Sequence, residues 1–302
     1  MQSLIHNHQR LLANMGKIYE REIFNKLDSS HRIRGIVGAR GIGKTTFLLH
    51  TIQKNYGSSP EALYVSADNF YFGNTTLIEL AEEFVQKYNG KLLCVDEINR
   101  YPNWAQELKN IYDSHPSLSI IFSGSSSIDL IQQKYDLSRR AVIHHLCGFS
   151  FREYLEWKCR KKFSTLTLEE VIKQRITGGD AISTTPKLLG HFSEYIKTGY
   201  YPFFDELGSS EDMYKALHAV IEKIIYSDIA SYYSLKTTTL PIFLKILSFV
   251  CTSKPSSLNV HRLAKSLGKY DSDVSHYLQI MRESGLLRFL MSNKKGYAKI
   301  RK

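Results

Sequence analysis

The segment from Gly38 to Thr45 reads GARGIGKT, which has the spacing of a loop that cradles phosphate groups. Its glycines let the backbone curl so that N–H groups converge on phosphate oxygens, and the helical pattern that follows would direct its positive end at the same anion. We expect the Lys44 ammonium to reach the β- and γ-phosphates and the Thr45 hydroxyl to ligate Mg²⁺. The predicted binding residues are Gly38, Ala39, Arg40, Gly41, Ile42, Gly43, Lys44, Thr45 and Thr46.

A second motif lies about fifty residues further along the chain, where the apolar run LLCV ends in two acids, Asp96 and Glu97. This pattern is typical of the Walker B element that accompanies a phosphate loop. We predict that Asp96 holds Mg²⁺, directly or through water, and that Glu97 positions and deprotonates an attacking water. A protein that only binds nucleotide has no need of such a base, so Glu97 indicates hydrolysis.

Polar and basic residues near the next two predicted strands are candidates to complete this site. Ser123 and Ser125 follow an apolar run, and we predict that one of them contacts the γ-phosphate or the attacking water. The alternative is a plain Ser/Gly turn. Arg140 precedes the last predicted strand and could stabilise charge in the transition state, the alternative being a solvated surface arginine.

A mostly parallel α/β sheet is expected to position these residues. Over the first 150 residues, short β-branched runs alternate with helical patterns, as in sheets covered by helices on both faces. Most of the runs are almost entirely apolar, which is typical of strands buried on both sides. The expected strands are 31–37, 62–67, 91–96, 118–123 and 142–147.

The β signal fades after residue 150, and the remainder reads as helical. Helices are expected over 151–158, 168–177, 186–198, 213–232, 260–267 and 271–284, and a β-like run follows at 286–291. The order helix, turn, helix, strand and basic turn at the end of the chain is that of a winged helix. We therefore predict a P-loop core (1–150), a helical lid or linker (151–240) and a winged-helix-like domain (241–302).

The composition of the 302 residues is that of a folded protein, with 43% hydrophobic and 23% charged residues. These values exclude wholesale disorder and collagen-like repeats. No apolar run approaches the roughly 20 residues that a membrane helix needs, so no membrane partner is expected. The four cysteines form no CxxC pair, which favours a reducing, cytoplasmic location.

The net charge of +11 is concentrated near the C-terminus, because residues 241–302 hold twelve basic and three acidic residues. This excess of +9 makes DNA a candidate partner through phosphate contacts that would be sensitive to salt. The side chains expected to face base edges are Ser272, Ser275, His276 and Gln279. The alternative is a module that packs on the core, contacts a protein partner or pairs with another copy of the chain.

Taken in order, these motifs resemble the bacterial and archaeal P-loop ATPases of the AAA_14 group, which are usually followed by a DUF4143 region. The segments that carry the resemblance are GARGIGKTTFL, LYVSADN, LLCVDEINRYPNWAQELKNIYD, IIFSGSSSIDL and RRAVIHHLCGFSFREYL, within residues 15–155. The resemblance implies an ASCE-type sheet in the order 5-1-4-3-2, ATP as the nucleotide, and Ser123 or Ser125 as sensor. The family's Gly-Arg pair aligns with Arg139–Arg140. Relatives usually continue into a nuclease-like domain, which we expect to be missing or cut off here. The resemblance therefore does not imply nuclease activity for this chain.

The sequence therefore predicts a Mg²⁺-dependent AAA-type ATPase that acts as a nucleotide-driven switch coupled to a winged-helix module. The alternative is a DNA-binding regulatory protein in which ATP is mainly a structural or allosteric ligand. Glu97 favours the first of these.

Overall fold

The computed structural model describes residues 1–16, 18–26, 30–124, 137, 139–177, 184–207, 209–254 and 258–290. The chain divides into two compact units, Met1–His218 and Ala219–Lys302, each with its own hydrophobic core. The boundary lies inside the segment 151–240 for which we expected a separate helical region, and the three-part division remains a prediction. In the described part of the chain, no helix combines the length and the apolar character that a membrane crossing requires.

A five-stranded parallel sheet forms the centre of the first unit, with the strand order β2-β3-β4-β1-β5. This is the order 5-1-4-3-2 that the family resemblance implied, and each strand agrees with its predicted bounds to within two residues. Burial on both faces explains the apolar runs, and all five residues of β3 are buried. The strands are β1 (Ile33–Val37), β2 (Ala62–Ser66), β3 (Leu92–Asp96), β4 (Ser119–Gly124) and β5 (Ala141–His145).

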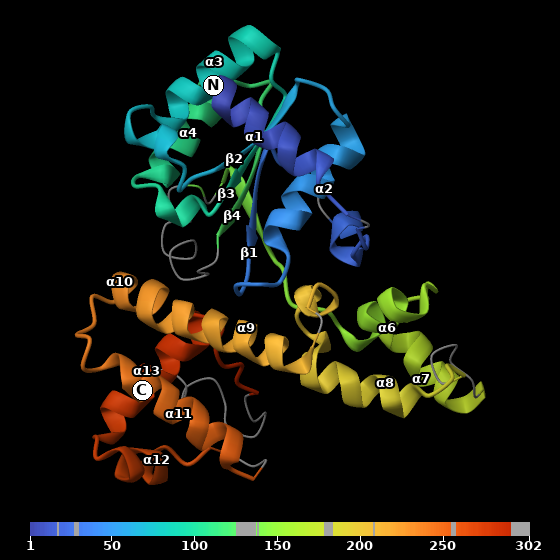
Figure 1. The fold of residues 1–302 in the computed structure, drawn as a ribbon, viewed down its shortest axis with the longest axis vertical. Helices are drawn as coiled ribbons and strands as arrows, with labels where there is room; N and C mark the ends of the chain where they lie inside the picture. Colours follow the sequence, from blue (N-terminus) through green and yellow to red (C-terminus); the bar gives the residue numbers. More distant parts are fainter. Residues whose placement is uncertain are drawn as a thin grey trace. The chain divides into compact units, whose positions relative to one another are not determined.

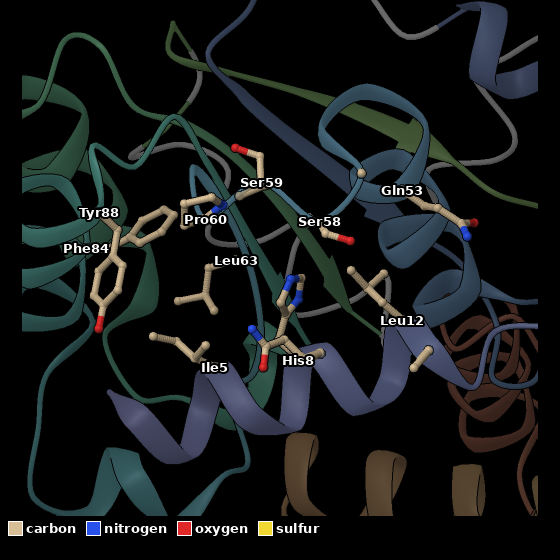
Figure 2. A pocket seen from close by; sticks show the side chains of 14 residues that line it. Ile5, His8, Leu12, Gln53, Ser58, Ser59, Pro60, Leu63, Phe84 and Tyr88 are labelled. Carbon is tan, nitrogen blue, oxygen red and sulfur yellow. The ribbon is translucent and has the colours of Figure 1, made fainter.

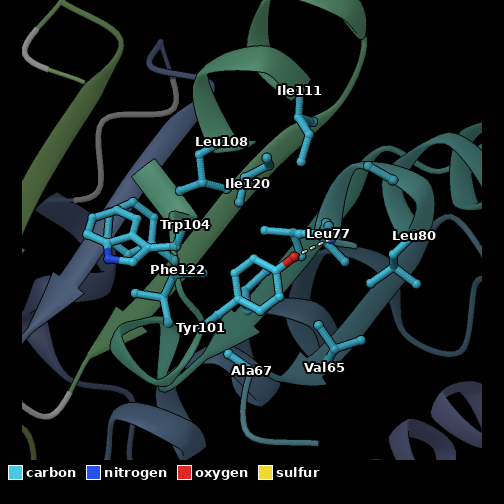
Figure 3. Packing of buried hydrophobic residues seen from close by; sticks show 14 of the residues in the cluster. Val65, Ala67, Leu77, Leu80, Tyr101, Trp104, Leu108, Ile111, Ile120 and Phe122 are labelled. Carbon is cyan, nitrogen blue, oxygen red and sulfur yellow. Dashed lines mark hydrogen bonds between the residues drawn. The ribbon is translucent and has the colours of Figure 1, made fainter. Parts of the chain in front are cut away.

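Helices cover both faces of this sheet (Figure 1). On one face lies α2 (Lys44–Tyr56), and on the other lie α3 (Leu77–Tyr88) and α4 (Trp104–Ser114). Figure 3 shows the second of these cores, in which Trp104 of α4 packs on Phe122 of β4 with ring centroids 5.3 Å apart. Because side chains alternate along a strand, the α2 face is the one on which Asp96 lies.

The sequence analysis did not predict the first helix, α1 (Gln2–Ala13), which packs along the edge strand β2. The backbone N–H of Tyr64 donates to Nδ1 of the buried His8 at 3.2 Å. Nδ1 is therefore the acceptor, and in the neutral ring the proton lies on Nε2. Burial also lowers the pKa of His8, which favours this neutral form.

The rest of the first unit is helical, as expected. The helix α6 begins with a reciprocal capping box between Ser150 and Glu153, and Thr167 and Glu170 pair in the same way at the start of α7. Three short 3-10 segments, η1, η2 and η3, connect the earlier elements. The elements are η1 (Glu22–Lys26), η2 (Phe70–Gly73), η3 (Ile98–Arg100), α6 (Phe151–Cys159), α7 (Leu168–Thr177), α8 (Leu188–Glu194), η4 (Tyr195–Gly199), η5 (Pro202–Asp205) and α9 (Ser210–Lys223).

The second unit is a small helical bundle around Phe243, Ile246 and Met281, all of which are fully buried. Its helix α12 ends at Gly268, whose φ of 60° is a left-handed conformation that favours glycine. The next helix, α13, begins at Asp271, so the two form a helix-turn-helix. The elements are η6 (Ile224–Ile229), α10 (Ala230–Tyr232), α11 (Leu240–Thr252), α12 (Val260–Leu267) and α13 (Asp271–Glu283).

The winged-helix prediction is not confirmed. The run 286–291 was expected to form the strand that leads into the wing, but its described residues, 286–290, have no strand conformation. Their apolar side chains Leu286, Leu287 and Phe289 instead pack against the helical core. The predicted wing at 293–296, like the basic residues that follow it, lies outside the described residues.

Candidate active site

The predicted phosphate loop connects β1 to α2, at the carboxyl end of β1. Gly41 and Gly43 have φ angles of 76° and 88°, a region that side chains rarely adopt. Lys44 is buried, and its ammonium donates to the carbonyls of Gly38 and Ala39 at 2.9 and 2.8 Å. The loop therefore curls around the ammonium of Lys44, as the motif predicts.

The two predicted Mg²⁺ ligands lie together at the base of this loop. Thr45, in the first turn of α2, donates from Oγ1 to Oδ2 of Asp96 at 2.6 Å. Asp96 is the last residue of β3 and is only 3% exposed. Two motifs 51 residues apart in the chain thus meet through a direct hydrogen bond.

Three further donors fix the Asp96 carboxylate. The Tyr64 hydroxyl donates to Oδ2 at 2.8 Å, on the same oxygen as Thr45. The Ser123 hydroxyl donates to Oδ1, and the backbone N–H of Glu97 donates to Oδ1 at 3.1 Å. Each carboxylate oxygen therefore accepts two hydrogen bonds, which uses the four positions a carboxylate offers.

Ser123 differs from its predicted role. We expected its hydroxyl to contact the γ-phosphate or the attacking water, but the side chain is fully buried and donates to Asp96. Its oxygen also accepts from the backbone N–H of Glu97 at 3.3 Å. In this arrangement Ser123 links the two acids of the motif. The other predicted sensor, Ser125, lies outside the described residues.

Glu97, the predicted base, lies one residue beyond the strand in a left-handed conformation with φ of 52°. Such strain in a residue other than glycine is concentrated at functional sites. Its Oε1 lies 3.8 Å from a guanidinium nitrogen of Arg40, in the phosphate loop. Among the described residues, its buried Oε2 has no hydrogen-bond partner.

A cavity of about 260 Å³ joins these groups, and the sequence analysis missed part of its wall. Arg40, Lys44, Thr45 and Glu97 line it together with residues of η5 and the residue after it, Pro202, Phe203 and Glu206. A Cβ atom on Gly41 would lie 2.7 Å from the Phe203 ring, so glycine is what permits this contact. No local signal in the sequence indicates that the segment around Pro202 lies against the phosphate loop.

A larger cavity, of about 550 Å³, lies beside the start of α2. It is bordered by Thr46 and Phe47 of α2 and by aromatic residues of the segment before β1, and Phe24 stacks on Phe47 with centroids 4.2 Å apart. Pro202 borders both cavities. Tyr19, Arg21, Trp157 and Arg160 also line this cavity.

Arg21 ties this segment to the body of the domain. Its guanidinium contacts both carboxylate oxygens of Glu153, at 3.1 and 3.3 Å, and donates to the carbonyls of Cys147 and Gly148 at 2.8 and 3.0 Å. Burial acts to raise the pKa of Glu153, but the hydrogen bond and the charge of Arg21 outweigh it, so the pKa is lowered. The pair fixes one wall of the larger cavity.

Arg140 does not lie at this site, which corrects the role we predicted for it in stabilising the transition state. It precedes β5, whose first residue, Ala141, lies level with Ile33 at the start of β1. The phosphate loop begins after the other end of β1, so the length of a strand separates the two. Arg140 instead donates to both carboxylate oxygens of Asp113 at 3.2 Å.

A third cavity, of about 520 Å³, lies between α1 and the start of β2 (Figure 2). His8, Leu12 and Leu63 line it together with Phe84 of α3. It contains none of the residues predicted to bind phosphate or metal.

The fold and this site define the class of protein. A parallel 5-1-4-3-2 sheet with a phosphate loop after β1 and an Asp-Glu pair after β3, two strands away, is the architecture of P-loop ATPases. Residues 30–155 match the AAA_14 family model, described as an AAA domain. This match confirms the resemblance to AAA-like P-loop ATPases that the motifs indicated. Where we expected a DUF4143 region, residues 189–301 match a model described as a domain of unknown function (DUF8612).

Two curated relatives come from Methanocaldococcus jannaschii. "Uncharacterized protein MJ1637" is 26% identical over 266 residues, which cover 83% of this chain and 55% of the relative. "Uncharacterized protein MJ1544" is 24% identical over 295 residues, which cover 93% of this chain and 61% of the relative. The chain thus spans less than two thirds of the length of either protein.

Among solved structures, the Walker-type ATPase PABY2304 of Pyrococcus abyssi aligns with a TM-score of 0.53 at 13% identity. The alignment covers 88% of this chain and 90% of that one. At this level of identity the likeness concerns the fold alone.

Proposed function

We propose that the chain binds ATP together with Mg²⁺ and hydrolyses it. The observation that carries this proposal is the hydrogen bond between Thr45 and Asp96 beneath the buried Lys44, because it joins the two halves of a triphosphate site. Glu97 borders the same cavity and supplies a carboxylate that could accept a proton from water.

The residues fit the metal that such a site uses. Mg²⁺ prefers oxygen ligands, and the oxygens here are the Thr45 hydroxyl and the Asp96 carboxylate. Because hydrogen bonds occupy the four acceptor positions of Asp96, its carboxylate would hold the ion through water. When bound with ATP, the ion would neutralise charge on the phosphates. The chain's own residues have separate tasks: Lys44 binds phosphate oxygens, Asp96 holds Thr45 in place, and Glu97 takes the proton.

We assign the larger cavity to the base of the nucleotide. It is lined by Ile42 and Gly43 of the phosphate loop and by Thr46, one residue beyond the loop, and its aromatic lining offers a surface on which a purine can stack. The choice of adenine over guanine rests on the family. Pro202, which borders both cavities, would then lie near the junction between the base and the phosphates.

The same segment supports the role of a switch. Pro202, Phe203 and Glu206 border the phosphate cavity, and a few residues later the chain enters α9, whose last residues belong to the second unit. A change of nucleotide that moves η5 would therefore act on the connection to that unit.

Phosphate release from ATP tests the enzyme proposal directly. Wild type should hydrolyse ATP only with Mg²⁺, Lys44→Ala should lose nucleotide binding, and Glu97→Gln should keep binding while losing about 10²- to 10⁴-fold in turnover. Lys54→Ala is the matched control, because this lysine lies at the far end of the same helix and pairs with Glu20. Equal, near-background turnover in all four proteins would refute the proposal.

DNA binding by the second unit is a second candidate function, favoured by one observation. Exposed polar side chains recur at helical spacing along α13, the second helix of the helix-turn-helix. The exposed set is Ser272, Ser275, His276, Gln279 and Arg282. At the start of the helix, the His261 ring lies 3.2 Å from the Asp271 carboxylate, an acid that would repel phosphate. In its protonated form the ring would offset this negative charge.

A labelled duplex titrated at rising salt tests this candidate. Gln279→Ala and Arg282→Ala should each weaken binding, and affinity should fall steeply with salt. Lys109→Ala, which removes an exposed lysine from α4 of the first unit, is the control. Binding that does not change with salt, or that both α13 variants retain in full, would argue against a DNA interface on this helix.

A further inference from the structure

We propose that Tyr64 is a positioning residue for the metal site: its hydroxyl holds the Asp96 carboxylate in the orientation that Mg²⁺ requires. This inference rests on the proposed function, because it concerns the same site. Tyr64 is not among the residues that we predicted for the site, and the strand that contains it, ALYVS, reads as ordinary core.

The sheet places the ring where it can reach the carboxylate. β2 and β3 run in parallel with Tyr64 level with Cys94, and Asp96 lies two residues further on along the same face. The tyrosine side chain is long enough to span that step, and its hydroxyl donates to Oδ2 at 2.8 Å. The residue is 4% exposed, and His8 accepts its backbone N–H, so it is fixed at both its ends.

The hydroxyl acts on the same carboxylate oxygen that holds Thr45, the predicted metal ligand. Oδ2 accepts hydrogen bonds from Thr45 and Tyr64, whereas Oδ1 accepts from Ser123 and from the backbone of Glu97. Two donors on each oxygen fix the plane of the carboxylate, and the loss of one leaves Oδ2 held by Thr45 alone.

Tyr64→Phe removes only the oxygen and should separate metal binding from nucleotide binding. Groups that orient a metal ligand typically contribute 10- to 100-fold in metal affinity. We therefore expect the Mg²⁺ concentration for half-maximal binding of a fluorescent ATP analogue to rise about tenfold. Binding of the same analogue in EDTA should match wild type, because Lys44 and the loop are unchanged.

Tyr101→Phe is the matched control. Tyr101 is also a buried tyrosine, whose hydroxyl donates to a carboxylate oxygen of Glu107 at 2.8 Å, but it belongs to the core on the other face of the sheet (Figure 3). Its variant loses the same kind of hydrogen bond and should leave the Mg²⁺ dependence unchanged. Recovery of wild-type affinity by Tyr64→Phe at high Mg²⁺ would show that the variant is folded and that only the metal step is impaired.

The outcomes separate the inference from the proposed function. Wild-type protein that binds no nucleotide with or without Mg²⁺ would overturn both. Wild-type binding that depends on Mg²⁺, with an unchanged midpoint in Tyr64→Phe, would overturn the role of Tyr64 and leave the proposed function intact. Equal losses with and without Mg²⁺ would also overturn it, since they would indicate general damage to the loop.

Discussion

The substitution Arg21→Met is the strongest quantitative test of the packing around the larger cavity. It removes the charge of Arg21 and keeps most of the aliphatic part of its side chain. The side chains of Arg21 and Glu153 are only 11% and 9% exposed, so the variant leaves a buried carboxylate without its cation. Breaking a buried pair from one side costs about 3–5 kcal/mol. Glu153 keeps its bonds to Ser150, at 2.9 and 3.0 Å, and we therefore expect the lower end, about 3 kcal/mol.

Urea unfolding followed by tryptophan fluorescence is the suitable assay. Both tryptophans, Trp104 and Trp157, lie in the first unit, so their signal reports the unfolding of that unit alone. Arg21→Met should lower the midpoint without changing the slope. Combined with Glu153→Gln in a double-mutant cycle, it should show a coupling of about 2 kcal/mol. A loss below about 1 kcal/mol, or strictly additive effects, would refute this account of the pair.

The same pair predicts a dependence on pH. The pKa of Glu153 is lowered in the native protein below its ordinary value of 4.5, so the unfolded chain takes up this proton at a higher pH than the native one. The stability that the pair contributes is therefore complete above the unfolded pKa and is lost as the pH falls through the native pKa. The difference between wild type and Arg21→Met should be constant near pH 7 and shrink below about pH 4.5.

Two further predictions concern the loop and the thiols. Gly38→Ala should lower ATP affinity at least tenfold and destabilise the first unit by about 1–3 kcal/mol, because its Cβ would lie 2.1 Å from the carbonyl oxygen of Leu146; an affinity equal to wild type in a nucleotide titration would contradict this. In the native protein, a thiol reagent should modify the exposed Cys147 and Cys251 but spare Cys94, whose pKa is raised by complete burial. Mass spectrometry before and after addition of urea checks this, and early modification of Cys94 would count against its burial.

The sequence was informative where chemistry and local structure coincide. Lys44, Thr45 and Asp96 belong to short motifs whose glycine and apolar patterns specify the loop and the strand, and the structure brings them together as expected. The five strands and most of the helices likewise followed from apolar periodicity and from caps such as Gly268.

The remainder depends on contacts that no local pattern encodes. Tyr64 reads as a core aromatic because its strand is apolar, and only the register of β2 with β3 shows where its hydroxyl ends. Phe203 lies against Gly41 of the phosphate loop only in the folded chain, because the two residues are far apart in the sequence. Arg140 illustrates the opposite error: it is close to a strand of the right sheet, but at the amino end, whereas the site lies at the carboxyl ends. Ser123 was placed at the right strand end, yet the direction of a hydroxyl depends on its neighbours.

The docking of α1 along β2 has a consequence for how these domains assemble. An edge strand with free backbone groups is a template on which a second chain can add a strand. Here His8 already accepts the N–H of Tyr64, and α1 packs along that strand. A partner that extends this sheet from the β2 side would first have to displace α1, and in doing so it would release the backbone of the residue that holds Asp96.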